Sequence, residues 1–285
     1  MSTVRDIIAS TTRYNLHSHT QFCDGRADMA SMAAQAVAEG FEHYGFSPHS
    51  PIPPAVHSTC NMRADSVDNY IAEFLRLRSL YSGRIALWLS MEIDYLGPSW
   101  GASHPYFSAL PLDYRISSVH FIPDKSGIET DVDGRPASFI RKMHEQFDDD
   151  IRYVVDTFYA RTLEMIEAGG FDIIGHFDKI GANASAFMSG IEEQAWYRRH
   201  IDNVIDALQG KDIVVEINTK SWLPYPGVTA EEVESHKPRL FPSPDTVRRL
   251  ASAGIPMAVN SDAHYPDRLN AGRREAYSLF SFMIP

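Results

Sequence analysis

Short apolar runs alternate along the chain with longer segments in which apolar residues are spaced three and four apart. The runs are typical of buried β-strands, and the spacing is typical of helices with one buried face. Seven predicted strands lie at 14–19, 43–46, 85–92, 116–120, 171–176, 213–218 and 256–262. Predicted helices between them cover 29–38, 67–81, 151–168, 191–208 and 244–253. Glycines typical of helix ends follow several helices: Gly40, Gly83, Gly169, Gly210 and Gly254.

Strands that alternate with helices predict parallel pairing through helical crossovers. Seven such units fit a β/α barrel better than a small open sheet, so we predict an α/β fold of the (β/α)7 type. No internal repeat, low-complexity tract or linker interrupts the chain, which predicts one domain over residues 1–285. Three long loops, 95–113, 122–137 and 219–243, each follow a strand. In a barrel such loops lie over the carboxyl-terminal face, where active sites are built.

Composition changes this picture little. The chain has 285 residues and a formal net charge of −11, which argues against a protein that follows a nucleic-acid backbone. Two cysteines provide no disulfide framework, the first residues lack the apolar segment of a signal peptide, and the longest apolar runs are too short to span a membrane. We therefore expect a cytoplasmic protein without a membrane partner.

Candidate metal ligands stand at the end of the first predicted strand. Side chains two apart on a strand point to the same face, so His17 and His19 can converge on one ion. Asp24 follows in the loop that leaves this strand. The same spacing recurs after the last strand, where Asp262 and His264 are two residues apart.

Four more strands end in residues of the same kind: His49, Glu92, His120 and His176. Each one alone has an ordinary explanation, as a buried histidine or as half of a buried ion pair. Together, six of the seven strands end in histidine, aspartate or glutamate, and parallel strand ends meet at one rim of a barrel. Packing requires no such cluster, and burying it is costly unless cations neutralise the charges. The pattern predicts a polynuclear metal site.

In eight segments the chain resembles the PHP (polymerase and histidinol phosphatase) superfamily, in family order: HSHT, CDG, SPHSP, MEIDY, SVHF, GHFD, EIN and SDAH. The resemblance runs from about Tyr14 to about His264, and SVHF, EIN and SDAH are similar to the histidinol-phosphate phosphatase branch in particular. It implies a distorted (β/α)7 TIM-like barrel. It also implies hydrolysis of a phosphomonoester, L-histidinol phosphate above all, by a hydroxide that bridges ions of a trinuclear site.

The resemblance further implies how the ligands are shared among three divalent ions. His17, His19, Glu92 and Asp262 would hold the first ion, and Glu92 would bridge to a second, completed by His120 and His176. The third would be held by Asp24, His49 and His264. Carboxylates and imidazoles suit Zn²⁺, Mn²⁺ or Fe²⁺. Asp262, His264 and Glu92 are the predicted catalytic residues.

The phosphate-binding residues are less evident from the sequence. After EIN the chain reads TKSWLPYPG, without the arginine-containing stretch that the resemblance implies. Three cations are candidates: Lys220 just after the sixth strand, Arg239 in a loop over the barrel, and Arg161 in the middle of a helix. A solvated helix face explains Arg161 equally well.

Three alternatives remain open beside a histidinol phosphatase. A PHP phosphoesterase could act on another substrate, such as a nucleotide, an oligonucleotide or a sugar or alcohol phosphate; the net charge disfavours nucleic acid. An inactive metal-binding module is disfavoured because all nine ligands are present. An amidohydrolase shares the first HxH motif, but it would use a lysine after the fourth strand where this chain has Glu92 after the third.

Overall fold

The computed structural model describes residues 3–281, whose parallel strands form two sheets. The first sheet has the order β1 (Tyr14–Asn15), β2 (His43–Phe46) and β3 (Ala86–Leu89). The second has the order β10 (Met257–Asn260), β9 (Val214–Asn218), β8 (Ile173–Ile174), β5 (Ile116–Ser118) and β4 (Glu92–Asp94). All pairs within these two sheets are parallel, which confirms the predicted β/α construction.

The seven predicted strands are all present, and one of them is bent. The segment predicted at 85–92 pairs with β2 as β3, passes through Ser90 and Met91, and then pairs with β5 as β4. Isolated parallel bridges join the two sheets, one between His49 and Glu92 and the other between Ser18 and Ala263. The order of neighbouring strands therefore matches the predicted TIM-like barrel type.

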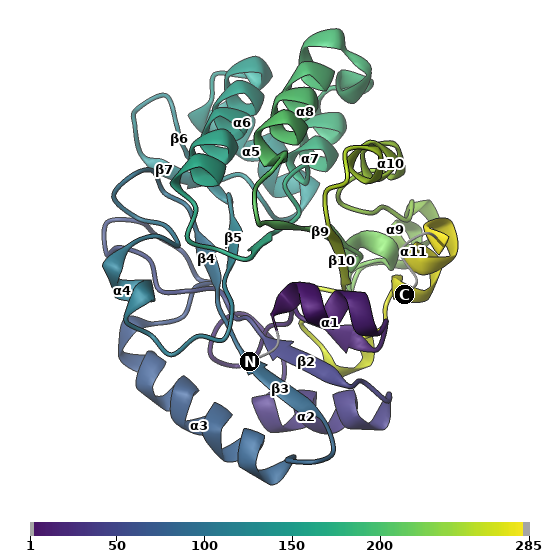
Figure 1. Ribbon diagram of the computed structural model, residues 1–285. Helices are drawn as coiled ribbons and strands as arrows, with labels where there is room; N and C mark the ends of the chain where they lie inside the picture. Colours follow the sequence, from purple (N-terminus) through teal and green to yellow (C-terminus); the bar gives the residue numbers. More distant parts are fainter. Residues whose placement is uncertain (1–2, 282–285) are drawn as a thin grey trace.

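Helices surround the strands, as Figure 1 shows. The five predicted helices are present as α2 (Met29–Ala38), α3 (Val67–Leu80), α6 (Ile151–Ala168), α8 (Ala195–Leu208) and α10 (Pro244–Ser252). The structure adds α1 (Val4–Ser10), α4 (Pro105–Ser108), α5 (Pro136–Gln146), α7 (Ile180–Phe187), α9 (Ala230–Ser235) and α11 (Arg273–Leu279). The loop predicted at 122–137 contains most of an antiparallel hairpin of β6 (Phe121–Pro123) and β7 (Glu129–Asp131).

One face of β9, of β5 and of β10 changes from apolar to polar along the strand. In β9, Val214 belongs to a small apolar cluster with Tyr14, Ile116 and Ala258, which lies beside Ile7 of α1. Residues two and four further along β9 point the same way and are polar. The same change occurs in β5 and β10. Apolar packing therefore fills the amino-terminal end of this face and polar groups gather at the carboxyl-terminal end.

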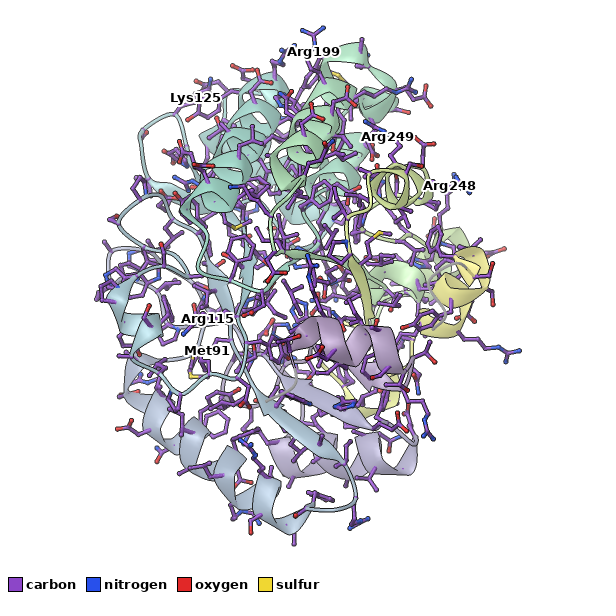
Figure 2. All side chains as sticks on the ribbon, viewed as in Figure 1. Met91, Arg115, Lys125, Arg199, Arg248 and Arg249 are labelled. Carbon is purple, nitrogen blue, oxygen red and sulfur yellow. The ribbon has the colours of Figure 1, made fainter. Side chains whose placement is uncertain are left out.

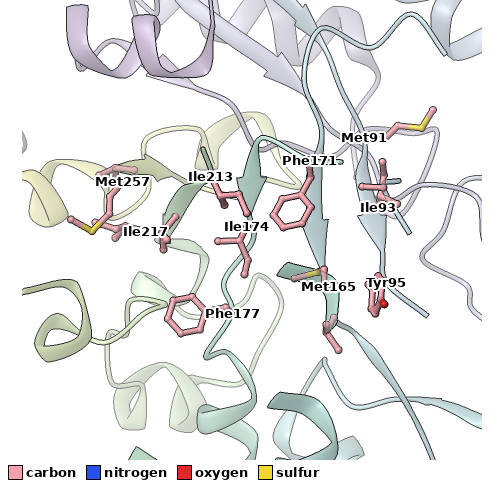
Figure 3. Packing of buried hydrophobic residues seen from close by; sticks show 14 of the residues in the cluster. Met91, Ile93, Tyr95, Met165, Phe171, Ile174, Phe177, Ile213, Ile217 and Met257 are labelled. Carbon is pink, nitrogen blue, oxygen red and sulfur yellow. The ribbon is translucent and has the colours of Figure 1, made fainter. Parts of the chain in front are cut away.

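The larger apolar cluster fills the space between strands and helices. It includes Phe171, Ile174, Ile213 and Ile217, all of which are buried. Figure 3 shows part of this packing. Along each of these strands, residues of the larger cluster alternate with residues of the opposite face. This alternation separates the apolar core from the candidate site.

Basic side chains are spread over the outside of the molecule. Figure 2 shows Lys125, Arg199 and Arg248 at separate places on the periphery. Within residues 3–281, no helix combines the length and the apolar character needed to cross a membrane.

Candidate metal centre

Glu92, at the start of β4, lies at the centre of a cluster of imidazoles. Its Oε2 is 3.3 Å from Nε2 of His17, 3.5 Å from Nε2 of His19 and 3.1 Å from Nδ1 of His49. Its other oxygen, Oε1, is 3.4 Å from Nε2 of His120 and 3.0 Å from Nε2 of His176. A carboxylate with imidazoles on both oxygens has the geometry of a bridge between cations.

Asp24, Asp262 and His264 complete the cluster. Oδ1 of Asp262 is 3.0 Å from Nε2 of His19, and Nε2 of His264 is 3.2 Å from Oδ2 of Asp24. The rings of His19 and His264 stack at 4.0 Å. The structure thus brings all nine predicted ligands together.

Two local backbone features place these side chains. Gly25 follows Asp24 in a loop that returns so close to the first strand that a Cβ would lie 2.3 Å from the Thr20 nitrogen. Only glycine allows this approach. Asp262 has a φ of 49°, in the left-handed region, so the extended backbone of β10 does not continue through this residue.

Three groups of donor atoms are compact enough to hold an ion. They are His19, Asp24, His49 and His264; His17, His19 and Glu92; and His49, Glu92 and His120. These groups overlap, with His19, His49 and Glu92 each in two of them, and they do not reproduce the division implied by the family resemblance. Which of the nine residues binds which ion therefore stays a prediction.

Hydrogen bonds behind the cluster orient three of the imidazoles. Nδ1 of His17 donates to Oε1 of Glu216 at 2.6 Å, and Nδ1 of His120 donates to Oδ1 of Asp94 at 2.6 Å. Nδ1 of His264 donates to the carbonyl oxygen of Asp262 at 3.0 Å. Because each Nδ1 carries the proton, each Nε2 turns a lone pair toward the cluster, as metal-binding histidines do.

Several buried atoms of the cluster have no hydrogen-bond partner. They are Oδ1 of Asp24, Oε2 of Glu92 and Nε2 of His120. Buried polar atoms are rarely left unpaired in folded proteins. Nε2 atoms of His17 and His19 also face each other at 3.2 Å. Imidazole and carboxylate donor atoms that face one another at these distances fit divalent cations such as Zn²⁺, Mn²⁺ or Fe²⁺.

The surroundings of two histidines in the cluster shift their pKa values in opposite directions. Burial would lower the pKa of His17, but Glu216, Glu92 and Asp262 hold it well above its ordinary value. Burial, together with His264 and His49, holds the pKa of His19 well below it. Carboxylates that favour a positive charge at His17 would equally favour a bound cation beside it.

The cluster opens into a cavity of about 320 Å³. Lys220 lines it, with Nζ 3.3 Å from both Oδ1 of Asp262 and Nε2 of His264. Burial would raise the pKa of Asp262, but Lys220 and His17 hold it well below its usual range. Of the three cations predicted to bind phosphate, Lys220 is therefore at the site.

The structure does not bring Arg161 and Arg239 to this cavity. Arg161 donates to both carboxylate oxygens of Glu129, at 2.6 and 3.0 Å, and Arg239 makes a two-point ion pair with Glu192. Both guanidinium groups are held by carboxylates outside the site. The sequence could not show this, because each partner is more than thirty residues away.

Sequence reasoning missed the two outer carboxylates, Asp94 and Glu216. A signal for both existed. Asp94 stands two residues after Glu92 in MEIDY, and Glu216 stands two before Asn218 in EIN, so each lies on the polar face of its strand. Their placement beneath the histidines shows that this face holds an orienting layer as well as the ligands.

A parallel β/α fold with imidazoles and carboxylates gathered at its strand ends defines a metal-binding protein of the TIM-like barrel type. The geometry supports divalent metal binding by this cluster. The chain belongs to the PHP domain family, whose model matches residues 15–220.

Relatives within this family are histidinol phosphatases. A probable histidinol-phosphatase of Deinococcus radiodurans is 26% identical over 256 residues, which cover 88% of this chain and 85% of the relative. The histidinol-phosphatase of Bacillus subtilis is 30% identical over 115 residues, which cover 37% of this chain and 43% of the relative.

Two solved structures share the fold. The putative histidinol phosphatase of Listeria monocytogenes has a TM-score of 0.77 at 17% identity, covering 94% of this chain and 99% of the other. Histidinol phosphate phosphatase of Lactococcus lactis, crystallised with zinc, L-histidinol and phosphate, has a TM-score of 0.65 at 17% identity, covering 96% and 94%. The chain is therefore a histidinol-phosphatase-like member of the PHP family.

Proposed function

We propose that this protein is a metal-dependent hydrolase that converts L-histidinol phosphate to L-histidinol and phosphate. The observation that carries the proposal is the position of Glu92, which faces five histidines while Asp24 and Asp262 line the same cavity. We further propose that the nine side chains hold three divalent ions, Zn²⁺, Mn²⁺ or Fe²⁺. The substrate assignment comes from relatives named as histidinol phosphatases.

The chemistry divides between the ions and the chain. Bound divalent ions lower the pKa of water and neutralise phosphoryl oxygens. Lys220 adds an ammonium group next to Asp262, where it can pair with a phosphate oxygen. Asp262 Oδ1 and His264 Nε2 both lie 3.3 Å from that ammonium, so they can exchange a proton with a group bound there.

A second candidate substrate class is a phosphomonoester with a further anionic group, such as a nucleotide. Arg26 and Arg135 line the cavity, and Arg135 lies over the Tyr225 ring at 5.9 Å. Guanidinium groups that line a cavity suit a second anion on the leaving group. The cationic amine of histidinol would gain nothing from them.

Phosphate release from a panel of substrates tests both candidates. The enzyme would be reconstituted in turn with Zn²⁺, Mn²⁺ and Fe²⁺ and given histidinol phosphate, a nucleoside monophosphate, a sugar phosphate and one phosphodiester. We expect the highest kcat/KM for histidinol phosphate. A preference for the nucleotide would favour the second candidate, and no hydrolysis of any monoester would refute the proposed function.

Asp262→Asn provides the matched variant for this assay. Asparagine keeps the size of the side chain but removes its charge and its capacity to take a proton. We expect turnover to fall at least a hundredfold, a loss typical of removing a general acid or base. Metal content, measured in parallel by elemental analysis, separates lost ligation from lost proton transfer. Full turnover with full metal content would remove Asp262 from the mechanism.

A further inference from the structure

Lys179 is a second buried lysine of the cavity, and the chemistry proposed for Lys220, Asp262 and His264 does not use it. It stands three residues after His176, immediately before α7, and its side chain is 11% exposed. Its Nζ lies 2.6 Å from Oδ2 of Asp133, just after β7. Both residues line the cavity together with Lys220.

The turn that carries Asp133 is fixed to α7. Asn183, one turn further along that helix, donates to the carbonyl oxygens of Val132 at 3.1 Å and Gly134 at 3.4 Å. The Asp133 amide donates to Oδ1 of Asp131 at 2.8 Å. Asp133 is therefore held in place from both sides, and it holds the Lys179 ammonium in turn.

The ammonium group has donors left over. It carries three N–H groups, and Asp133 is its one hydrogen-bond acceptor in the part of the chain that the structure describes. Unused donors of a buried ammonium are costly unless a ligand or water accepts them. Because Lys179 lines the cavity of the metal cluster, a ligand bound in this cavity can accept its unused N–H donors.

The side chains of Lys179 and Lys220 line the same cavity. Burial would lower the pKa of Lys179, but Asp133 and then Asp262 raise it well above its usual range. In this cavity the two ammonium groups can bind the same anion.

We propose that Lys179 is a phosphate-binding residue that forms, with Lys220, a two-lysine clamp, and that Asp133 is the positioning residue for Lys179. This inference rests on the proposed function and names part of its substrate site. It also accounts for the missing arginine after EIN, since two ammonium groups supply the charge without a guanidinium. A single lysine binds phosphate as a point charge and does not fix its orientation. Two lysines that bind the same phosphate would fix its orientation.

The competing explanation is that Lys179 and Asp133 form a structural ion pair between the hairpin and α7. The two explanations differ in their consequences for Asp133. A structural pair loses the same contact whichever partner is removed. A phosphate-binding lysine keeps its charge in Asp133→Asn and loses it only when Lys179 itself is replaced.

Calorimetric titration of the metal-loaded protein with inorganic phosphate separates them. We expect Lys179→Met to weaken phosphate binding at least tenfold and Lys179→Arg to restore part of the affinity. Asp133→Asn should weaken binding by no more than about threefold, because asparagine still offers Lys179 a positioning oxygen. The matched control is Lys142→Met, because Lys142 pairs with Asp131 of the same hairpin at 3.1 Å and does not line the cavity. It should leave phosphate binding unchanged.

Equal losses in Lys179→Met and Asp133→Asn, or no loss in Lys179→Met, would overturn the inference, as would a wild type that binds no phosphate. Metal content is measured for every variant, and Lys179→Gln replaces Lys179→Met if the latter does not fold. Steady-state kinetics then distinguishes the two proposals. If the wild type binds phosphate through Lys179 but hydrolyses no monoester, the function fails and the inference stands. If it hydrolyses monoesters while Lys179→Met keeps both KM and phosphate affinity, the inference fails alone.

Discussion

At the scale of single residues, the site depends on acceptors that lie behind the histidines. Glu216 accepts hydrogen bonds from Nδ1 of His17, the His176 amide, and the side-chain amides of Asn218 and Asn260. Four donors converge on one buried carboxylate, which fixes the His17 ring and its tautomer. Charged acceptors of this kind also make an imidazole a stronger ligand.

Glu216→Gln should therefore weaken metal binding although it changes no predicted ligand. Glutamine has the same size, but one of its two terminal atoms is a donor and would face donors. Loss of such a partner costs about 10–100-fold in metal affinity. Competition with a chelator, followed by elemental analysis, measures the change. Glu129→Gln, at the ion pair with Arg161 outside the site, is the control and should leave metal affinity unchanged.

At the scale of secondary-structure elements, the ends of β5 and β8 support the central carboxylate. Ser118 at the end of β5 donates to Oε1 of Glu92 at 2.7 Å. Gly175, just after β8, lies against that hydroxyl: a Cβ there would come within 2.2 Å of the Ser118 oxygen. The absence of a side chain at Gly175 lets the two strand ends approach.

Gly175→Ala should both destabilise the fold and disturb the site. An added methyl group must displace Ser118, and overpacking of this kind costs about 1–3 kcal/mol. We expect a lower melting temperature and weaker metal binding. Gly210→Ala is a matched control, because Gly210 has a φ of 73° and open space around it, so alanine brings backbone strain alone. Equal metal affinity in both variants would contradict a role of Gly175 at the site.

At the scale of the whole molecule, the metal cluster ties together residues from the beginning and the end of the chain. Asp24 lies 3.2 Å from His264 across 240 positions of sequence. Ions bound by such residues stabilise the folded state alone, because the unfolded chain cannot assemble the cluster.

Chelation should therefore lower the melting temperature. Free metal at a thousand times its dissociation constant stabilises a protein by about 4 kcal/mol, a loss on the order of 10 °C for a chain of this size. Differential scanning calorimetry with and without a chelator measures it, and native mass spectrometry during metal addition counts the ions. Glu92→Gln should show a much smaller shift than Glu129→Gln. A wild type that melts at the same temperature after complete metal removal would contradict the metal centre.

Much of this protein could be read from local sequence patterns. Periodicity depends on residues a few positions apart, so it predicted the seven strands and five of the helices, and it placed His17 and His176 at strand ends. Glu92, predicted to end its strand, instead begins β4. Periodicity could not predict the bend between β3 and β4, because partner exchange depends on the neighbouring strands. The hairpin of β6 and β7 was missed because the segment that contains most of it, 122–137, has no regular apolar spacing.

Contacts between distant residues were decided by the tertiary structure alone. His17 meets Glu216 across 199 positions, and that contact determines which ring nitrogen faces the cluster. The two candidate arginines pair with Glu129 and Glu192 outside the site, whereas Lys179 and Lys220 line the cavity. Residue type and spacing specify which chemistry a strand end can offer. The distance and direction between those ends follow from how the whole chain packs.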